Sequence, residues 1–147
     1  MPTKAKKQQK IIGRIEKVSF PELDLLQIDA KVDTGAYTSS IHCIRIKKIT
    51  QEDRAVLEVT FLQKNNTEKP QVVRYFHNFT TVKVKSSNGK QEERFKVKAV
   101  ILIGQKKYKS ELTLSNRSKM KYPVLLGRKV LNKRFLVDVS KKYNLGI

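Results

Sequence analysis

One acidic residue in this sequence stands where a carboxylate could take part in catalysis. Asp33 directly follows an apolar stretch that ends in Val32, and Thr34 and Gly35 come next. Because glycine adopts backbone conformations that other residues avoid, Gly35 lets the chain turn sharply just after the acid. Such a turn presents a carboxylate in a rigid loop. A three-residue pattern of this kind also occurs by chance in ordinary turns, so it indicates a site only together with other features.

A second segment, nearer the C-terminus, has the pattern of a buried strand followed by a helix. Residues 123–126 read Pro-Val-Leu-Leu, and Gly127 and Arg128 follow them. The next apolar residues fall at the start of a short predicted helix over residues 128–133. The strand that ends in Gly-Arg is the second feature that raises the significance of the acidic loop.

The rest of the chain predicts the short strands that would position these residues. Apolar and polar residues alternate in stretches that recur about every eight to twelve residues, as in β-barrels and sandwiches. Asn88 and Gly89 lie between two such stretches, and Asn-Gly is a strong hairpin signal because both residues tolerate positive φ. The predicted strands are residues 11–20, 25–32, 41–49, 55–62, 72–79, 80–85, 94–103 and 106–114. We therefore expect one all-β domain over residues 11–147, after a basic flexible tail at residues 1–10.

Together these features resemble the retropepsin signature. In that family a hydrophobic-Asp-Thr-Gly-Ala loop precedes a flap hairpin, and a strand ending in Gly-Arg precedes a helix. The match is closer to one bacterial branch, the retropepsin-like family once labelled ATP-dependent zinc proteases and associated with RimK-type ATP-grasp ligases. The blocks that resemble it occur in order at residues 12–14, 20–23, 30–36, 38–42, 111–117, 125–128 and 134–138. The resemblance implies a closed acid-protease barrel with a flap hairpin and one short helix after the Gly-Arg strand.

The resemblance also implies an aspartic endopeptidase. Such enzymes activate water with two carboxylates that share one proton, because like charges about 3 Å apart cannot both ionise. This chain has a single Asp-Thr-Gly, so the second carboxylate would be Asp33 of another copy in a symmetric homodimer. Asp33, Thr34 and Gly35 form the expected catalytic loop, with Thr34 bracing it across the two-fold axis. Ala36 supplies no hydroxyl to the ionised acid, which implies activity extending toward mildly acidic or near-neutral pH.

The same resemblance implies which residues bind substrate and which support the loop. We expect Ala36, Tyr37, Asn88, Gly89 and Arg128 to bind substrate, and His42, Gly127 and Asp138 to give structural support, with His42 orienting the Asp33 loop. Retroviral enzymes pair the Gly-Arg arginine with an acid that follows Asp-Thr-Gly-Ala, whereas Tyr37 stands here. Three partners for Arg128 stay open: Asp138, a backbone carbonyl, or an acidic substrate. Asp138 is expected in an ion pair with Arg128 or Arg134.

The charge balance bears on the partner. With 32 Lys and Arg against 13 Asp and Glu, the formal net charge is +19. Such a field favours anionic partners, and with the family's association with glutamate-adding ligases it predicts an acidic or glutamate-rich peptide substrate. The charge could equally belong to a solvated surface without effect on specificity. The competing function is a non-catalytic basic β-barrel that binds an anionic polymer or nucleic acid. Nucleic acid is not favoured, because zinc-finger, helix-turn-helix and RNP-like patterns are absent.

The sequence gives little indication of a metal, a cofactor or a membrane. Neither histidine, His42 nor His77, belongs to a His-Glu-x-x-His pattern, and adjacent strand residues His42 and Cys43 point to opposite faces. We expect no metal and no cofactor. A lone cysteine excludes an intramolecular disulfide. No apolar stretch approaches the roughly 20 residues that span a bilayer. No signal peptide is visible, so we expect a cytoplasmic location, or a periplasmic one if an export signal has been removed.

Overall fold

The structure, a computed structural model, describes residues 8–63, 68, 70–85, 88–116 and 121–146. In chain order its elements are β1 (Lys10–Ile12), β2 (Ile15–Phe20), the 3₁₀ turn η1 (Pro21–Leu23), β3 (Leu25–Val32), β4 (Ser39–His42), β5 (Arg45–Gln51), β6 (Arg54–Leu62), β7 (Gln71–Phe76), β8 (Thr80–Lys85), β9 (Gln91–Ile103), β10 (Lys106–Ser115), β11 (Val124–Leu126), α1 (Arg128–Leu131) and β12 (Phe135–Val137). Residues 1–7 of the expected tail lie outside the described residues, and Lys10 belongs to β1 rather than to a tail.

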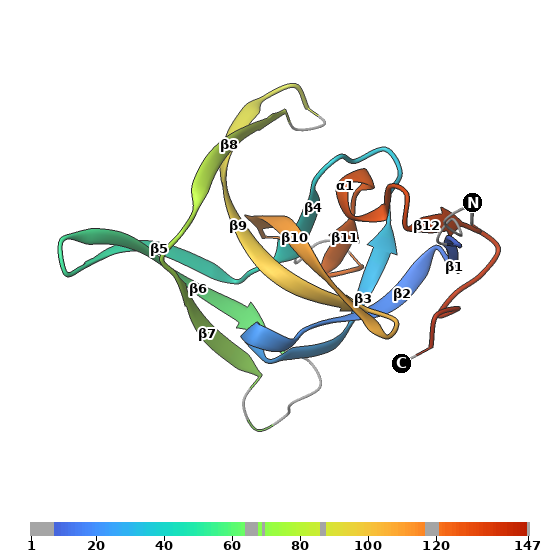
Figure 1. The fold of residues 1–147 in the computed structure, drawn as a ribbon. Helices are drawn as coiled ribbons and strands as arrows, with labels where there is room; N and C mark the ends of the chain where they lie inside the picture. Colours follow the sequence, from blue (N-terminus) through green and yellow to red (C-terminus); the bar gives the residue numbers. More distant parts are fainter. Residues whose placement is uncertain (1–7, 64–67, 69, 86–87, 117–120, 147) are drawn as a thin grey trace, which may run out of the picture.

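Six strands close into a barrel (Figure 1). Hydrogen-bonded neighbours follow the order β10-β4-β11-β3-β2-β9, and β9 pairs with β10 to complete the ring. β8 extends the sheet by pairing with the other part of β9. The interior is filled by large apolar side chains such as Phe20, Ile101 and Leu112, each fully buried. Removing apolar surface from water is the main term that stabilises such a core. The closed all-β barrel confirms the fold class predicted from the sequence.

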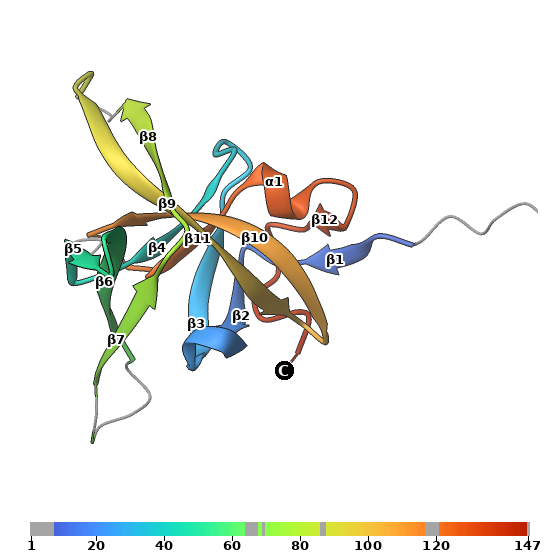
Figure 2. The same ribbon diagram turned by 60° about the vertical axis from the view of Figure 1, so that its left-hand side comes forward.

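A separate three-stranded sheet, ordered β5-β6-β7, packs beside the barrel (Figure 2). Its Phe61 and Phe76 rings meet edge to face with centroids 6.2 Å apart, and both belong to the same core cluster as the barrel side chains. Gln63 Nε2 also donates a 2.8 Å hydrogen bond to the Asp24 carbonyl, just after η1. The sheet is therefore fixed to the barrel by both apolar and polar contacts.

Two stretches predicted as single strands are divided in the structure. Residues 41–49 split into β4 of the barrel and β5 of the three-stranded sheet. Residues 11–20 split into β1 and β2 around Gly13, where a Cβ would lie 2.5 Å from the Lys141 carbonyl oxygen. The helix is also shorter than predicted, because α1 ends at Leu131 and Lys133 has a left-handed φ of 65°. In each case a long-range contact or a local backbone conformation overrides the alternation of residue types.

The elements around the Asp33 loop meet at one end of the barrel. β11 lies between β3 and β4, and α1 follows β11 directly. The β8–β9 hairpin projects toward the same end as the loop between β3 and β4, in both views of the fold (Figures 1 and 2). β1 and β12 form a small parallel sheet beside α1. Among the described residues, no helix has the length and apolar character needed to cross a membrane.

Candidate active site

Asp33 is held at the end of a strand that has neighbours on both sides. β3 pairs antiparallel with β2 and parallel with β11, with Val32 opposite Leu126. The Asp33 N–H donates a 2.9 Å hydrogen bond to the Leu126 carbonyl, and the Val32 N–H donates one of equal length to the Arg14 carbonyl. Because the backbone is fixed from both sides, the position of the carboxylate is set by the barrel itself.

The turn after Asp33 aims a backbone donor at the carboxylate. The Gly35 N–H donates to Asp33 Oδ1 at 2.9 Å, and the Ala36 N–H donates to the Asp33 carbonyl at 3.3 Å. A Cβ on residue 35 would lie 3.2 Å from Asp33 Oδ1, a tight contact. Asp33 is half-buried, whereas Thr34 and Gly35 are exposed. The carboxylate is thus oriented by a hydrogen bond and still open to solvent or to a partner.

The start of α1 holds the next part of the loop. The first N–H groups of a helix have no partner within the helix. Here the Arg128 N–H donates to the Ala36 carbonyl at 2.8 Å, and the Lys129 N–H donates to the Tyr37 carbonyl at 2.9 Å. Gly127 permits this approach, since a Cβ there would lie 2.6 Å from the Tyr37 carbonyl oxygen. The predicted supporting position of Gly127 therefore has a steric explanation.

The Arg128 side chain also bonds to the loop. Its Nη1 donates to the Thr34 carbonyl at 3.0 Å, and its guanidinium lies 5.8 Å from the centre of the Tyr37 ring. Of the three Arg128 partners left open by the sequence, the one present in the structure is a backbone carbonyl, that of Thr34. Tyr37 is 57% exposed, and Lys129 Nζ lies 6.0 Å from the same ring. Two cations therefore lie close to this exposed aromatic ring.

His42, predicted to orient the Asp33 loop, lies at the far end of β4. The backbone N–H of His42 donates to the Pro123 carbonyl at the end of β4 farther from the loop. Ser39, at the near end, contacts the Gly-Arg segment, because its Oγ accepts a 3.0 Å hydrogen bond from the Gly127 N–H. A buried serine inside an alternating stretch gave no signal in the sequence that would distinguish it as a loop contact. The orienting role expected for His42 stays a prediction.

The expected ion pair of Asp138 is wrong. Its Oδ1 accepts hydrogen bonds from the Ser140 hydroxyl at 2.6 Å and from the Ser140 N–H at 3.0 Å, and these contacts lower the pKa of the carboxyl. Within the described residues Asp138 has no ion pair. Arg134 instead donates to the Val130 carbonyl and stacks on Tyr108. Asp138 therefore bonds within a local turn near the C-terminus, and the predicted arginine partners lie elsewhere.

The hairpin predicted as a flap is present. β8 and β9 pair antiparallel down to Lys85 opposite Gln91. Gly89 has a φ of +83°, and Asn88 Oδ1 accepts a hydrogen bond from the Lys90 N–H at 3.2 Å. Asn88 and Gly89 therefore lie in the connection between two antiparallel strands, as the Asn-Gly pair predicts. The β8–β9 hairpin projects toward the end of the barrel where β3 connects to β4 (Figure 1).

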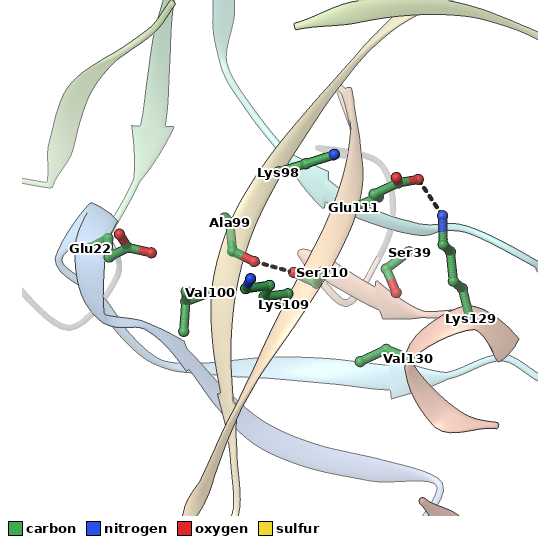
Figure 3. Close-up of a pocket in the computed structure, with 10 residues that line it drawn as sticks. All are labelled: Glu22, Ser39, Lys98, Ala99, Val100, Lys109, Ser110, Glu111, Lys129 and Val130. Atoms are coloured by element: carbon green, nitrogen blue, oxygen red, sulfur yellow. Dashed lines mark hydrogen bonds and ion pairs between the residues drawn. The ribbon is translucent and has the colours of Figure 1, made fainter. Parts of the chain in front are cut away.

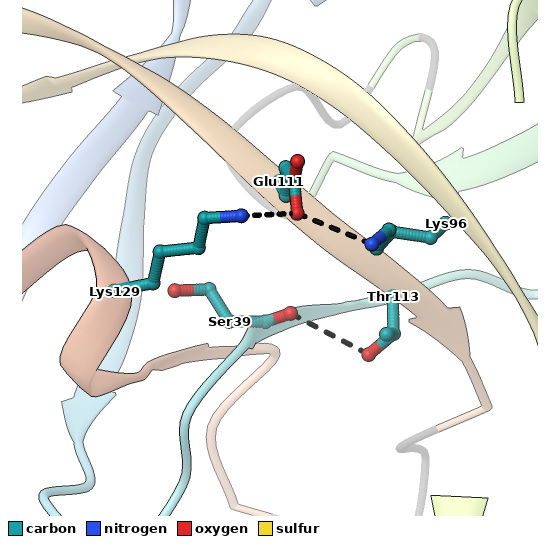
Figure 4. A network of polar contacts seen from close by, with 5 residues as sticks. All are labelled: Ser39, Lys96, Glu111, Thr113 and Lys129. Carbon is teal, nitrogen blue, oxygen red and sulfur yellow. Dashed lines mark hydrogen bonds and ion pairs between the residues drawn. The ribbon is translucent and has the colours of Figure 1, made fainter. Parts of the chain in front are cut away.

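A polar network that the sequence did not indicate is centred on Glu111 (Figure 4). Glu111 on β10 binds Lys129 at 2.6 Å and Lys96 at 3.2 Å through the same oxygen, Oε2. The Lys129 hydrogen bond is the largest cause that lowers the pKa of Glu111, and the same bond raises the pKa of Lys129. Thr113 on the same strand donates to the Ser39 carbonyl at 3.4 Å. The network connects β10 to both α1 and β4.

The described residues contain one carboxylate at this loop and no cluster of three or more metal-ligating side chains. In this part of the chain Asp33 forms no ion pair and no hydrogen bond to another carboxylate. Cys43 is buried, which raises the pKa of its thiol to about 12 and leaves it a poor nucleophile. The chemistry available at the loop is that of a single oriented carboxylic acid.

A closed barrel that places Asp-Thr-Gly-Ala against a Gly-Arg strand and helix defines the retropepsin-like class of proteins. The family model described as retropepsin-like aspartic endopeptidase RimB matches residues 11–145. The chain therefore belongs to the RimB-like family of retropepsin-like proteins, which confirms the resemblance recognised in the sequence.

The chain is also similar to curated proteins and to a solved structure. Proteins named probable alpha-L-glutamate ligase from Shewanella pealeana and Shewanella halifaxensis are each 37% identical over 136 residues, or 92% of this chain. The chain spans about 30% of the length of these curated relatives. The crystal structure of a protein with unknown function from Legionella pneumophila is similar with a TM-score of 0.76 at 26% identity, covering 94% of this chain and 99% of that one.

Proposed function

We propose that this protein is an aspartic endopeptidase whose water nucleophile is activated by two Asp33 carboxylates, one from each of two copies. The observation that carries the proposal is the Asp33 carboxylate itself, oriented by the Gly35 N–H at the end of a strand fixed on both sides. Two such groups brought together share one proton, so one accepts a proton from water while the other donates to the peptide carbonyl. Family membership supports the same chemistry.

The exposed parts of the loop support a role in assembly and binding. Thr34 is exposed while its carbonyl is held by Arg128, which leaves its hydroxyl available to brace a second copy of the loop. Tyr37, at the rim, and Asn88 and Gly89, in the flap turn, are proposed to contact the substrate backbone and side chains. Ala36 is proposed to line the cleft floor.

An exposed apolar patch supports a homodimer. Ile11 on β1 and Leu136 on β12 are direct cross-strand neighbours, 43% and 55% exposed, and Val139, two residues after the end of β12, is 72% exposed. We call these three residues the terminal patch. Arg14 connects it to the site, since its Nη1 donates to the Val139 carbonyl and its own carbonyl accepts from Val32, next to Asp33. Exposed apolar side chains that neighbour one another, as Ile11 and Leu136 do, are typical of protein interfaces.

The substrate is proposed to be an acidic polypeptide. The formal net charge of +19 attracts anionic chains and repels cationic ones. The relatives named alpha-L-glutamate ligases add a second argument, because a ligase of glutamate forms bonds that a peptidase of this class would hydrolyse. An acidic, glutamate-rich peptide is therefore the first substrate to test.

The test is cleavage of an oligoglutamate-containing peptide, followed by mass spectrometry, with wild-type protein and Asp33→Asn. We expect the variant to lose at least about a thousandfold in kcat/KM, a loss typical of removing a group essential to the chemistry. Asp29→Asn, on β3 outside the loop, is the control. A wild-type protein that binds polyanions but cleaves neither acidic nor neutral peptides would instead support the non-catalytic barrel.

A further inference from the structure

An open pocket of about 510 Å³ lies between β9, β10 and α1 (Figure 3). Three lysines from these three elements line it: Lys98, Lys109 and Lys129. Lys98 and Lys109 are brought together by the antiparallel pairing of β9 with β10, while Lys129 comes from the helix after the Gly-Arg strand. The volume is in the range of sites that bind organic ligands.

The pocket lining contains lysines that are not paired with acidic side chains. Lys129 and Lys96 share the carboxylate of Glu111. In the part of the chain that the structure describes, Lys98 and Lys109 form no ion pair. Glu22, at the far side of the pocket, is the other acid in the lining. An incoming anion would therefore meet two ammonium groups without competing for the pair that holds Glu111.

The walls favour an organic carboxylate over an inorganic anion. Ala99, Val100 and Val130 give the pocket an apolar side, which suits methylene groups next to a charge. Glu111 shows how a glutamate side chain is held by two lysines in the same place. Lysine ammonium groups are separate point charges, so they bind several spaced carboxylates as readily as one compact group.

A second hollow indicates that the ligand is extended. It has a volume of about 560 Å³, shares Lys98 with the pocket, and is also lined by Lys96 and His77. Because an extended peptide advances roughly 3.3–3.6 Å per residue, a run of acidic residues reaches both hollows where a small anion fills one.

We propose that this lysine pocket binds the acidic side chains of a polypeptide, outside the Asp33 loop. The inference rests on the proposed function in so far as that polypeptide is the substrate. The pocket adjoins the loop through Lys129, whose N–H holds the Tyr37 carbonyl and whose Nζ lies over the Tyr37 ring. A substrate anchored there would run past Tyr37, so its acidic segment would be held while a neighbouring peptide bond reaches the carboxylates.

The test measures binding without cleavage. In an Asp33→Asn background, fluorescence anisotropy at low salt gives the Kd of a labelled oligoglutamate peptide for two double variants. Lys98→Ala/Lys109→Ala removes both unpaired pocket lysines. Lys47→Ala/Lys107→Ala removes two exposed lysines of β5 and β10 that do not line the pocket, and so matches the net charge. Thermal unfolding of both variants checks that the fold is retained.

We expect the pocket variant to bind about tenfold more weakly and the control to change by less than about twofold, because close charge contacts outweigh a distant, screened field. Equal losses in the two variants, or no loss in either, would overturn the proposal. Competition with inorganic phosphate and with free glutarate separates the ligand classes. If either compound displaces the peptide at an equal concentration of phosphate or carboxylate groups, the site binds small anions and the peptide assignment is wrong. Pocket-dependent binding by a wild-type protein that cleaves nothing would contradict the proposed peptidase while the pocket assignment stands.

Discussion

At the scale of single residues, the geometry of the loop depends on close approach of two backbones. A Cβ on residue 127 would lie 2.6 Å from the Tyr37 carbonyl oxygen and 2.9 Å from the Thr38 carbonyl carbon. Backbone atoms cannot move aside as the end of a flexible side chain does. The glycine therefore sets the distance between the Asp33 loop and α1.

Gly127→Ala is predicted to lower the free energy of unfolding by about 3 kcal/mol, since the clash forces the loop from the helix. Gly89→Ala is the control: it also replaces a glycine, at a φ of +83°, but nothing lies within 4 Å of its added Cβ. That variant is expected to lose about 1 kcal/mol from backbone strain alone. Urea denaturation compares the two, and equal losses would contradict the steric explanation.

The sequence predicted the Asp33 loop and the Gly-Arg segment, but not all of the contacts between them. Glycine at position 127 fits the motif, whereas the reason for it is a contact across about ninety residues of chain that no local pattern encodes. The same is true of Ser39. Its sequence context does not distinguish it from other strand serines, and its contact with Gly127 is visible only in the folded structure. The prediction of an ion pair for Asp138 was wrong because the carboxylate accepts a hydrogen bond from the hydroxyl of Ser140, two residues away, instead of pairing with an arginine.

At the scale of elements, Glu111 joins β10 to α1 through Lys129 and to β9 through Lys96. Its pKa lies below the ordinary 4.5, mainly because of the Lys129 hydrogen bond. A carboxyl with a lowered folded pKa stabilises the protein above its unfolded pKa, and the contribution is lost as pH falls through the folded value. The raised pKa of Lys129 acts in the other direction, with its contribution lost only at strongly alkaline pH.

Glu111→Gln is therefore predicted to destabilise the protein by about 1 kcal/mol at pH 7, as expected for a partly exposed ion pair. The difference from wild type should become smaller as the pH falls below about 4.5 and through the lowered folded pKa of Glu111, because the wild-type carboxyl is then protonated too. Urea denaturation over this pH range measures it, with Glu93→Gln on the exposed flap strand as control. A difference that stays unchanged across the acidic pH series would show that charge is not the cause.

Glu16 fixes the C-terminal segment to the turn between β1 and β2. It is buried, and its carboxylate accepts hydrogen bonds from the N–H groups of Gly13, Asn144 and Leu145 at 2.7, 3.1 and 3.2 Å. No lysine or arginine pairs with it in the described part of the chain. The backbone donors alone compensate its burial.

Glu16→Gln is predicted to cost about 2 kcal/mol, because the amide nitrogen cannot accept the hydrogen bonds that one carboxylate oxygen accepts. Hydrogen exchange at the amides of residues 144 and 145 should accelerate more than exchange at the barrel strands. Glu52→Gln, in the exposed turn before β6, should change neither quantity. Uniform acceleration across the barrel would instead indicate that Glu16 supports the whole core.

The strand pattern was largely predictable, with informative exceptions. Leu25–Val32 and Thr80–Lys85 match the predicted ranges, since alternation of apolar and polar residues records which face is buried. The prediction failed where one alternating run serves two sheets, at β4 and β5, and where the backbone at Lys141 packs on Gly13. Those boundaries depend on tertiary contacts and leave no periodic signal.

At the scale of the whole molecule, the net charge was predictable and its arrangement was not. The surplus of lysine is plain in the composition, yet the pocket forms because β9–β10 pairing and the position of α1 bring Lys98, Lys109 and Lys129 together. The terminal patch is hidden in the same way, since Ile11 and Leu136 come from opposite ends of the chain and meet only through β1–β12 pairing.

If the terminal patch is where two copies meet, a charge placed on it should separate them. Leu136→Asp changes a side chain that is 55% exposed, so the fold is expected to tolerate it, while burying an unpaired carboxylate in the interface is costly. The control is Val73→Asp on β7, a 41% exposed apolar residue of the other sheet. Analytical ultracentrifugation should show a wild-type dimer, a retained dimer for the control, and a monomer for Leu136→Asp at the same micromolar concentration.

If each copy supplies one of the two carboxylates, as we propose, peptidase activity should be retained in the control and lost in Leu136→Asp. Specific activity of Leu136→Asp is expected to rise with protein concentration as the dimer re-forms, whereas that of the control stays constant. A wild-type protein that sediments as a monomer while cleaving peptides would contradict the shared dyad. A Leu136→Asp variant that remains dimeric would instead place the interface elsewhere on the molecule. Since Arg14 connects Val139 to the residue before Asp33, we expect loss of the interface and loss of cleavage to occur together.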